Sequence, residues 1–309
     1  SFSSSPLSVW KDKVDTYLDA LCKEIAYGAE AYKGRTLTTV YIGGGTPTTL
    51  DPAQLERLLG EIEAHFDLSH VQEFTVEAGR PDSITEGKLR SMKTHGVTRI
   101  SINPQSMKEH TLELLGRKHT VEEIREKFML ARTLGFDNIN MDLIAGLPEE
   151  TLEDFKETLR EVEALKPDSI TVHTLVIKRA SRLRKEQLEQ GGEMREEDAC
   201  IEPMQKEAEQ FCRVHGYEPY YMYRQKNKAH TTRNTNQENV AYAKPGKECL
   251  YNIFIMEELQ SILALGSGGS SKIVFPEENR MERVENVKSV DDYIGRIDEM
   301  IRRKKESWR

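Results

Sequence analysis

Apolar residues recur along the first half of the chain with two different spacings. Short apolar runs rich in β-branched residues, such as Leu37–Ile42 and Val97–Ile102, are typical of buried strands. Between such runs, apolar residues three and four positions apart predict amphipathic helices, as in Leu152–Leu165. The alternation of the two patterns predicts repeated β-α-β units, and therefore a parallel sheet with helices packed against it.

The expected elements before residue 176 follow this alternation throughout. Strands are expected over 37–42, 71–76, 97–102, 136–143 and 169–175, and helices over 8–30, 84–95, 108–115, 121–134 and 152–165, with a further helix that begins at Asp51-Pro52. We interpret residues 1–176 as a barrel core. A doubly wound open sheet is the alternative fold, but no G-x-G-x-x-G motif supports it.

The pattern changes after residue 176. Residues 193–215 are expected to be largely helical, with Pro203 as a break or kink. Tyrosine-rich and glycine-rich segments then predict a smaller α+β or antiparallel region over 177–309. A closing helix is expected over 287–305, and its basic last turn, 302–305, suits the helix dipole.

Composition narrows the classes of function. The chain has 309 residues, 31% of them charged and 37% hydrophobic, and a formal net charge of −8. An acidic sum argues against general binding to nucleic acids or anionic membranes. No apolar run approaches the roughly 18 residues that cross a bilayer, and no secretory signal is recognisable. The four cysteines form no C-x-x-C pair, so we expect reduced thiols in a cytoplasmic protein.

Polar residues stand at or just after the carboxyl ends of the predicted strands, which is the functional face of a β/α barrel. They are Thr46, Glu77, Gln105, Asp142 and His173. Gly43-Gly44-Gly45 precedes Thr46, and glycines there would let a ligand touch the backbone. A sharp turn that needs positive φ explains the glycines equally well.

Each of these polar residues also has an ordinary structural interpretation. Glu77 could accept from ribose hydroxyls or an ammonium group, or pair with Arg80 at the surface. Gln105 could bind a ligand or follow an Asn-Pro turn, and Arg117 could bind a carboxylate or complement a helix end. Asp142 needs a partner, either a ligand hydroxyl or a nearby arginine.

Two further residues suggest a binding surface. Arg224 and Lys226 follow an aromatic run, 220–223, and rings beside cations suit a flat, polyanionic, partly apolar ligand. A solvated face or a local nucleic-acid patch is the alternative.

The motifs taken in order resemble one family. Gly-Gly-Gly-Thr-Pro-Thr, Val-Glu-Ala-Gly-Arg-Pro, Arg-Ile-Ser-Ile-Asn-Pro-Gln-Ser, Leu-Gly-Arg-Lys-His and Asn-Met-Asp-Leu-Ile-Ala-Gly-Leu-Pro resemble the radical S-adenosylmethionine (SAM) family. The similar branch is the oxygen-independent coproporphyrinogen III oxidases. Ala-Lys-Pro-Gly-Lys-Glu-Cys-Leu-Tyr-Asn and Gly-Ser-Gly-Gly-Ser are closest to its coproporphyrinogen dehydrogenase subgroup, often called HemZ. The resemblance implies a partial (β/α)6 TIM-type barrel without its first strand.

The resemblance also implies roles for matched positions. Residues matched to SAM contacts are Gly44, Gly45, Thr46, Glu77, Gln105, Arg117, Asp142 and Val176, the last beside the adenine. Arg224 and Lys226 would bind the substrate. The family holds a four-iron four-sulfur cluster on a C-x3-C-x2-C loop that ends just before the position of Ser1. We therefore expect this chain to lack the cluster ligands, to contain no metal site or catalytic residue of its own, and to be inactive alone.

The implied reaction is haem biosynthesis without oxygen. A 5′-deoxyadenosyl radical would take a hydrogen atom from a propionate of coproporphyrinogen III, and loss of carbon dioxide would leave a vinyl group. The implied partners are a tetrapyrrole substrate and an electron donor for the cluster, with no nucleic acid and no membrane span. A haem-delivery chaperone and a radical SAM haem-degrading methyltransferase remain alternatives.

Overall fold

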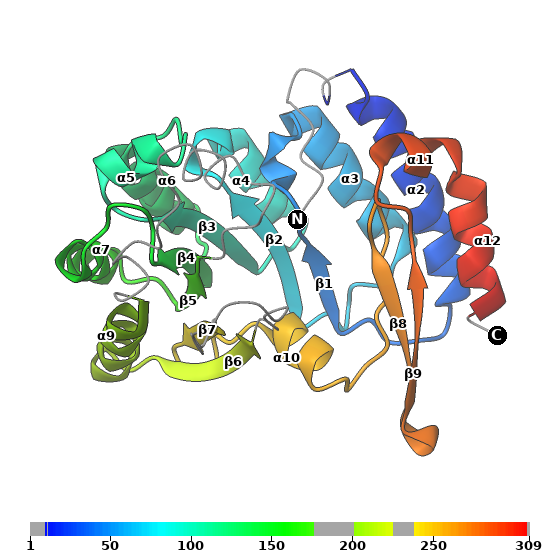
Figure 1. Ribbon diagram of the computed structural model, residues 1–309. Helices are drawn as coiled ribbons and strands as arrows, with labels where there is room; N and C mark the ends of the chain where they lie inside the picture. Colours follow the sequence, from blue (N-terminus) through cyan, green and yellow to red (C-terminus); the bar gives the residue numbers. More distant parts are fainter. Residues whose placement is uncertain (1–9, 11, 176–200, 225–237, 308–309) are drawn as a thin grey trace, which may run out of the picture. The chain divides into compact units, whose positions relative to one another are not determined.

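The structure, a computed structural model, describes residues 10, 12–175, 201–224 and 238–307 (Figure 1). The chain divides into two compact units that are both discontinuous in sequence. The first unit contains residues 1–77, 85–98 and 249–309, and the second contains residues 78–84 and 99–248. The domain boundary predicted at residue 176 falls outside the described residues and stays a prediction.

The first unit begins with a strand pair and the helices that precede and follow its strands. The elements are α2 (Val14–Ala31), β1 (Thr39–Ile42), η1 (Pro47–Thr49), α3 (Pro52–His65), β2 (Glu73–Gly79, whose last two residues belong to the second unit) and α4 (Glu86–Thr94). β1 is parallel to β2, with Tyr41 opposite Thr75. α3 lies between α2 and α4 and contacts both (Figure 1). Helix α3 begins at the predicted Asp51-Pro52, where Asp51 forms a capping box with Gln54.

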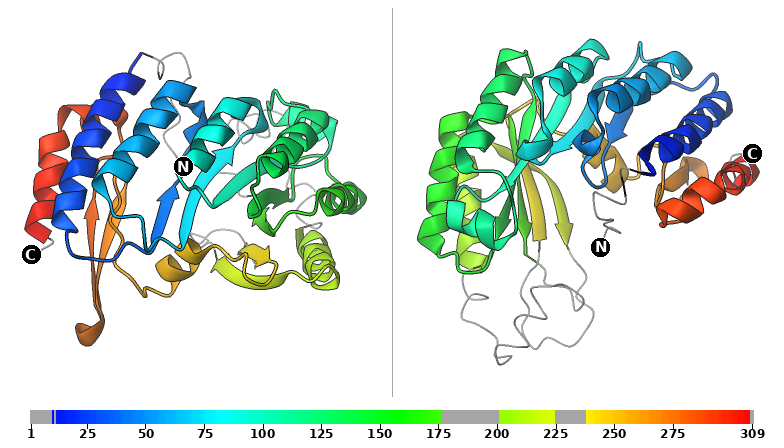
Figure 2. Two further views of the ribbon diagram at one scale, coloured as in Figure 1. Left: turned by 180° about the vertical axis from the view of Figure 1, so that it is seen from behind. Right: turned by 90° about the horizontal axis from the view of Figure 1, so that it is seen from above.

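The end of the chain completes the first unit. Its elements are α10 (Leu250–Met256), β8 (Ser270–Phe275), η4 (Pro276–Glu278), β9 (Arg280–Glu285), α11 (Val290–Gly295) and α12 (Ile297–Ser307). β8 and β9 form an antiparallel hairpin, which agrees with the α+β or antiparallel region predicted after residue 176. α11 and α12 contact α2, and α12 lies beside α2 in Figures 1 and 2. The prediction of a single closing helix over 287–305 was wrong. α11 ends at Gly295, and Arg296 leaves helical geometry with a φ of −122°.

The second unit contains the other parallel strands. Its elements are η2 (Pro81–Ser83), β3 (Arg99–Gln105), α5 (Glu109–Leu114), α6 (Val121–Thr133), β4 (Ile139–Ala145), α7 (Leu152–Leu165), β5 (Ser169–Thr174), α9 (Ile201–Val214), β6 (Glu218–Arg224) and β7 (Glu238–Ala243). β3, β4 and β5 are parallel neighbours, whereas β7 is antiparallel to β5 and β6 is antiparallel to β7. Pro203 was predicted to break or kink this region, but α9 does not end there.

The two faces of β3, β4 and β5 differ in chemistry. Ile100, Ile102, Met141, Leu143 and Ile170 are fully buried. Helices α6 and α9 contact these strands and α7 packs between the two helices, on the outer side of the strands in Figure 2. The alternate positions on the strands carry polar side chains, because successive residues of a strand point to opposite faces. Thus one face builds the core and the other presents polar groups.

The observed strands start and end two to three residues later than predicted at several places. β2 continues to Gly79 and β3 to Gln105, so Glu77 and Gln105 lie within strands rather than after them. In the described part of the chain, no helix combines the length and the apolar character needed to span a membrane.

Candidate functional site

In the first unit, the glycine loop and Glu77 are in direct contact. The Gly44 amide donates to Oε2 of Glu77 at 3.2 Å, and the Tyr41 hydroxyl donates to Oε1 at 2.5 Å. Each carboxylate oxygen is therefore held by its own donor. Two motifs 33 residues apart therefore meet at the carboxyl ends of β1 and β2.

The three glycines of this loop serve different purposes. Gly44 and Gly45 have φ values of +83° and +102°, which side chains disfavour, and a Cβ at either would meet no atom within 4 Å. A Cβ at Gly43 would lie 2.5 Å from Cε1 of Tyr41 and 2.6 Å from Oε1 of Glu77. Gly44 and Gly45 are therefore explained by a turn that needs positive φ. Gly43 has a different purpose, because it lets Tyr41 and Glu77 approach the backbone.

Replacement of Gly43 by alanine tests this packing. We expect Gly43→Ala to lower the free energy of unfolding by about 1–3 kcal/mol, because overpacked sites must shift their neighbours. Thermal unfolding of Gly43→Ala beside Gly87→Ala provides the measurement, since a Cβ at Gly87 meets nothing within 4 Å. Equal stability of the two variants would contradict the close packing at Gly43.

A buried lysine anchors the segment that follows the glycines. Lys88 of α4 is only 8% exposed, and its Nζ donates to the carbonyl oxygen of Thr48 at 2.6 Å. Burial lowers the pKa of Lys88. The Thr46 carbonyl accepts from both the amide and the hydroxyl of Thr49. Lys88 was not predicted as an anchor, because one lysine in an amphipathic helix resembles a surface residue.

In the second unit, Arg117 lies in a cluster of charged side chains. Arg80 forms two hydrogen bonds to Asp82, of 3.0 and 2.8 Å, so Arg80 pairs with Asp82 rather than with Glu77. Burial and the nearby charge of Arg80 lower the pKa of Arg117. Burial and Arg117 lower the pKa of His119, whose Nδ1 lies 3.8 Å from Asp82. The positive charge of Arg117 lies near that of Arg80, and burial makes the charge of Arg117 unfavourable. An anionic ligand would compensate this charge.

Gln105 adopts an unusual backbone conformation at the end of β3. Its φ is +70°, in a region that costs a residue with a side chain about 1–3 kcal/mol. The β3–β4 register shifts between Ile102 and Gln105, where Asn103-Pro104 intervenes. The bulge therefore changes the direction of Gln105, which is buried.

Asp142 is held by neighbours on the polar face of the second unit. Nδ2 of Asn140 donates to its Oδ1 at 2.7 Å, and Nε2 of His173 lies 3.7 Å from its Oδ2. Burial alone would raise the pKa of Asp142, but His173, Asn140 and Thr171 outweigh burial and lower it. The partner expected for Asp142 is thus present within the chain, and it is histidine and asparagine rather than arginine.

The same face carries polar residues that were not predicted from the sequence. Arg99 donates to the Ser169 hydroxyl at 3.0 Å, and Ser169 and Thr171 both donate to Oδ1 of Asn140. Oγ of Ser101 and Oδ1 of Asn103 are buried without a hydrogen-bond partner among the described residues. The signal was present as polar residues at every second position of three strands.

The predicted site residues divide between the two units. Gly44, Gly45, Thr46 and Glu77 belong to the first unit, and Gln105, Arg117, Asp142 and His173 belong to the second. Convergence of all of them on one ligand stays a prediction. Val176, Lys226 and the Arg224 side chain lie outside the described residues.

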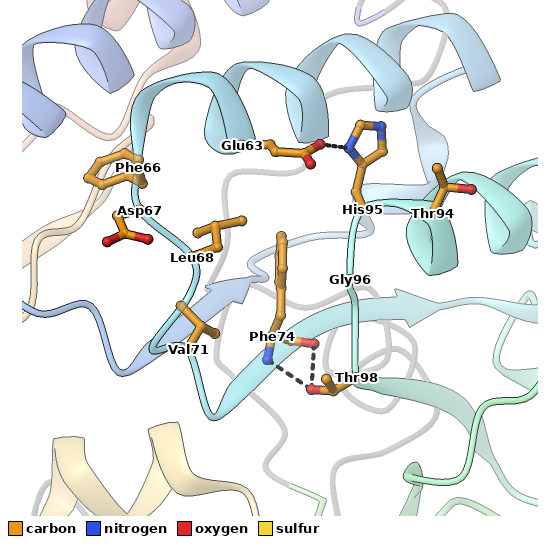
Figure 3. A pocket seen from close by; sticks show the side chains of 10 residues that line it. All are labelled: Glu63, Phe66, Asp67, Leu68, Val71, Phe74, Thr94, His95, Gly96 and Thr98. Atoms are coloured by element: carbon orange, nitrogen blue, oxygen red, sulfur yellow. Dashed lines mark hydrogen bonds and ion pairs between the residues drawn. The ribbon is translucent and has the colours of Figure 1, made fainter.

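A separate cavity of about 460 Å³ lies at the other end of β2 in the first unit (Figure 3). Phe74 and Val71 line it near the start of β2, and His95 lines it across from Glu63, with 2.6 Å between Nδ1 and Oε2. Ligands of β/α folds bind at the carboxyl ends of the strands. This cavity is therefore not part of the candidate site.

The comparisons identify the class of protein. Residues 12–162 match the radical SAM superfamily model. A structural alignment with the solved coproporphyrinogen III oxidase (HemN) from Escherichia coli covers 94% of this chain and 63% of that chain. The TM-score of the alignment is 0.72, and the sequence identity is 24%. Residues 12–162 are therefore similar to a radical SAM domain, and the predicted partial-barrel fold is confirmed.

Curated relatives narrow the resemblance. The chain is 44% identical over 263 residues to the oxygen-independent coproporphyrinogen-III oxidase-like protein HemZ of Bacillus subtilis. The aligned residues make up 85% of this chain and 51% of that protein. It is 29% identical to the haem chaperone HemW of Escherichia coli, over 86% of this chain and 63% of that protein. The chain thus spans between about half and two thirds of the length of these two relatives.

The radical SAM family uses SAM and a four-iron four-sulfur cluster. The first unit fits part of SAM, because a fixed carboxylate beside a loop without Cβ atoms matches an ammonium group next to backbone. No group of three or more histidine, cysteine or acidic side chains in the described residues could hold a metal ion. Cys22, Cys212 and Cys249, the cysteines within that part, form no disulfide with one another.

Proposed function

We propose that this chain is the SAM-binding part of a radical SAM oxidoreductase that converts propionates of coproporphyrinogen III into vinyl groups without oxygen. The observation that carries the proposal is the carboxylate of Glu77, held by the Gly44 amide and the Tyr41 hydroxyl beside a loop without Cβ atoms. The 44% identity to a coproporphyrinogen oxidase-like protein supports the substrate class. We place the protein in the cytoplasm.

In this proposal the chain's own residues bind and orient SAM. Glu77 accepts hydrogen bonds from the ammonium group, and Gly44 and Gly45 let that end of the ligand lie against the backbone. Arg117, beside Arg80, pairs with the SAM carboxylate, and Asp142 with Gln105 bonds to the ribose and adenine side. The chemistry supplied by the bound cluster and SAM is hydrogen-atom abstraction from the substrate. The partners are a tetrapyrrole, an electron donor that reduces the cluster, and an electron acceptor that takes the one electron left when carbon dioxide departs.

The test uses the full-length protein that contains the cluster cysteines. After anaerobic reconstitution with iron and sulfide, we expect it to release 5′-deoxyadenosine in the presence of SAM and a reductant. With coproporphyrinogen III, mass spectrometry should show loss of carbon dioxide and two hydrogen atoms from each propionate that reacts. Absence of both products from a protein with an intact cluster would overturn the proposed reaction.

Haem delivery is the second candidate function, because haem chaperones are among the relatives that match 86% of this chain. The two functions separate in one pair of measurements on the same reconstituted protein. Tight haem binding in a spectroscopic titration, without conversion of the porphyrinogen, would favour the chaperone. Conversion without tight haem binding would favour the oxidoreductase.

A further inference from the structure

We infer that Tyr41 and Tyr251 are positioning residues that hold the carboxylate of Glu77 in the direction the SAM ammonium group requires. Glu73 in turn holds Tyr251. This inference rests on the proposed SAM site and adds to it a support built from the far end of the chain. All four residues belong to the first unit.

The hydroxyl of Tyr41 contacts the carboxylate directly. Its oxygen lies 2.5 Å from Oε1 of Glu77, and the Gly44 amide holds Oε2. Tyr41 is paired with Thr75 in the β1–β2 register, and Glu77 lies two residues beyond Thr75 on the same face of β2. A carboxylate on a flexible side chain with a separate donor on each oxygen has lost most of its freedom to rotate.

The ring of Tyr41 is itself held by Tyr251. The two ring centroids are 4.3 Å apart and their planes are 20° from parallel, which is a stacked arrangement. α10, which carries Tyr251, packs on β1. Stacking restricts the rotation of the Tyr41 ring about its side-chain bonds, and so restricts the place of its hydroxyl.

Glu73 fixes the start of α10. Its Oε2 accepts from the Leu250 amide at 2.8 Å, and its Oε1 accepts from the Tyr251 amide at 3.3 Å and from Sγ of Cys249 at 3.4 Å. Glu73 is only 4% exposed, so these donors compensate a carboxylate removed from water. Its negative charge at the amino end of a helix is also favourable.

One strand therefore presents two carboxylates with complementary tasks. Glu73 and Glu77 lie four positions apart on the same face of β2. The first fixes the helix whose tyrosine stacks on Tyr41, and the second receives the Tyr41 hydroxyl. Gly43 completes the arrangement, because a Cβ there would collide with both Tyr41 and Glu77.

The test compares two ligands on the full-length reconstituted protein. SAM carries the ammonium group, whereas methylthioadenosine keeps the nucleoside and lacks the amino acid. We expect Tyr41→Phe to weaken SAM binding about tenfold in calorimetry, because a hydrogen bond to a charged group is lost. Methylthioadenosine binding should stay unchanged. Tyr27→Phe is the control, because Tyr27 is a half-buried tyrosine on α2 of the same unit.

Two further variants separate positioning from general damage. Tyr251→Leu keeps the Tyr41 hydroxyl but removes the ring that restricts its place, so we expect a smaller loss of SAM affinity, about threefold. In a Glu77→Gln background, Tyr41→Phe should cause almost no further loss, since the two residues act through one bond.

Either of two results would overturn the inference. One is a Tyr41→Phe protein that binds SAM as tightly as the Tyr27→Phe control does. The other is an equal loss of affinity for SAM and methylthioadenosine, which a merely structural role would produce. A wild-type protein with an intact cluster that binds neither ligand would overturn the proposed function, and this inference with it.

Discussion

Replacement of Glu24 by alanine is expected to lower the free energy of unfolding by about 3–5 kcal/mol, the cost of breaking a buried ion pair. Glu24 and Lys304 are both fully buried, and Oε1 of Glu24 lies 2.7 Å from Nζ of Lys304. Oε1 also accepts from Asn286, and Oε2 accepts from the Tyr293 hydroxyl and the Gly266 amide. The variant leaves a buried ammonium group without its counter-charge, and three neutral donors without their acceptor.

The dependence of the free energy of unfolding on pH provides a second test of this prediction. Burial lowers the pKa of Lys304 even beside Glu24, and loss of the carboxylate lowers that pKa further. An unfolded chain then binds this proton more tightly than the folded one, so stability rises with pH below the ordinary lysine pKa of about 10.4. We therefore expect the penalty of Glu24→Ala in denaturant unfolding to be smaller at about pH 9.5 than at about pH 7.

Two variants control the experiment. Glu30→Ala removes an exposed carboxylate from the same helix and should change stability by less than about 0.5 kcal/mol. The double variant Glu24→Leu with Lys304→Met removes both charges and should recover much of the loss, since no unpaired ion remains. A penalty for Glu24→Ala as small as that of Glu30→Ala would show that Glu24 does not hold this network together.

This network also shows what local sequence patterns cannot reveal. Lys304 lies in the basic last turn that we interpreted as a complement to the helix dipole, and its side chain is fully buried beside Glu24. Glu24 and Lys304 are 280 residues apart in the sequence. Their burial follows from the packing of α12 on α2, which no periodicity within either helix encodes.

The parts of the site that could be predicted are those whose signal is local. Gly44, Glu77 and Asp142 lie after or in the second half of strands that the apolar pattern itself marks, so a parallel arrangement of strands predicts them. Tyr251 escaped prediction because its partner, Tyr41, is 210 residues earlier in the chain. Segment 251–256 belongs to the region predicted as α+β or antiparallel, and it forms most of helix α10.

The polar face of the second unit is an intermediate case. Asn140, Asp142 and the residues of β5 alternate with buried apolar residues, and that alternation was visible in the sequence. We predicted Asp142 and His173 at the carboxyl ends of these strands, but we did not predict the polar residues that alternate along them. Polar residues at every second position show that these strands have one polar face and one apolar face.

Replacement of Glu77 by glutamine is expected to weaken SAM binding about tenfold to a hundredfold, because a hydrogen bond between charged groups contributes about 1.5–3 kcal/mol. The amide keeps the size of the side chain but loses its charge. It also has a single oxygen, and the Gly44 amide can only donate, so that oxygen turns toward Gly44. The NH2 group then faces Tyr41, and the ammonium group of SAM loses a negative partner.

Binding is measured by calorimetry on the full-length reconstituted protein, with Glu86→Gln as the matched control. Glu86 is an exposed glutamate of α4 that pairs with Arg90, so its loss should leave SAM affinity unchanged. Methylthioadenosine, which has no ammonium group, should bind Glu77→Gln as well as it binds the wild type. SAM binding by Glu77→Gln that equals the control would show that the carboxylate beside Gly44 does not receive the ammonium group, and the proposed orientation of the ligand would be wrong.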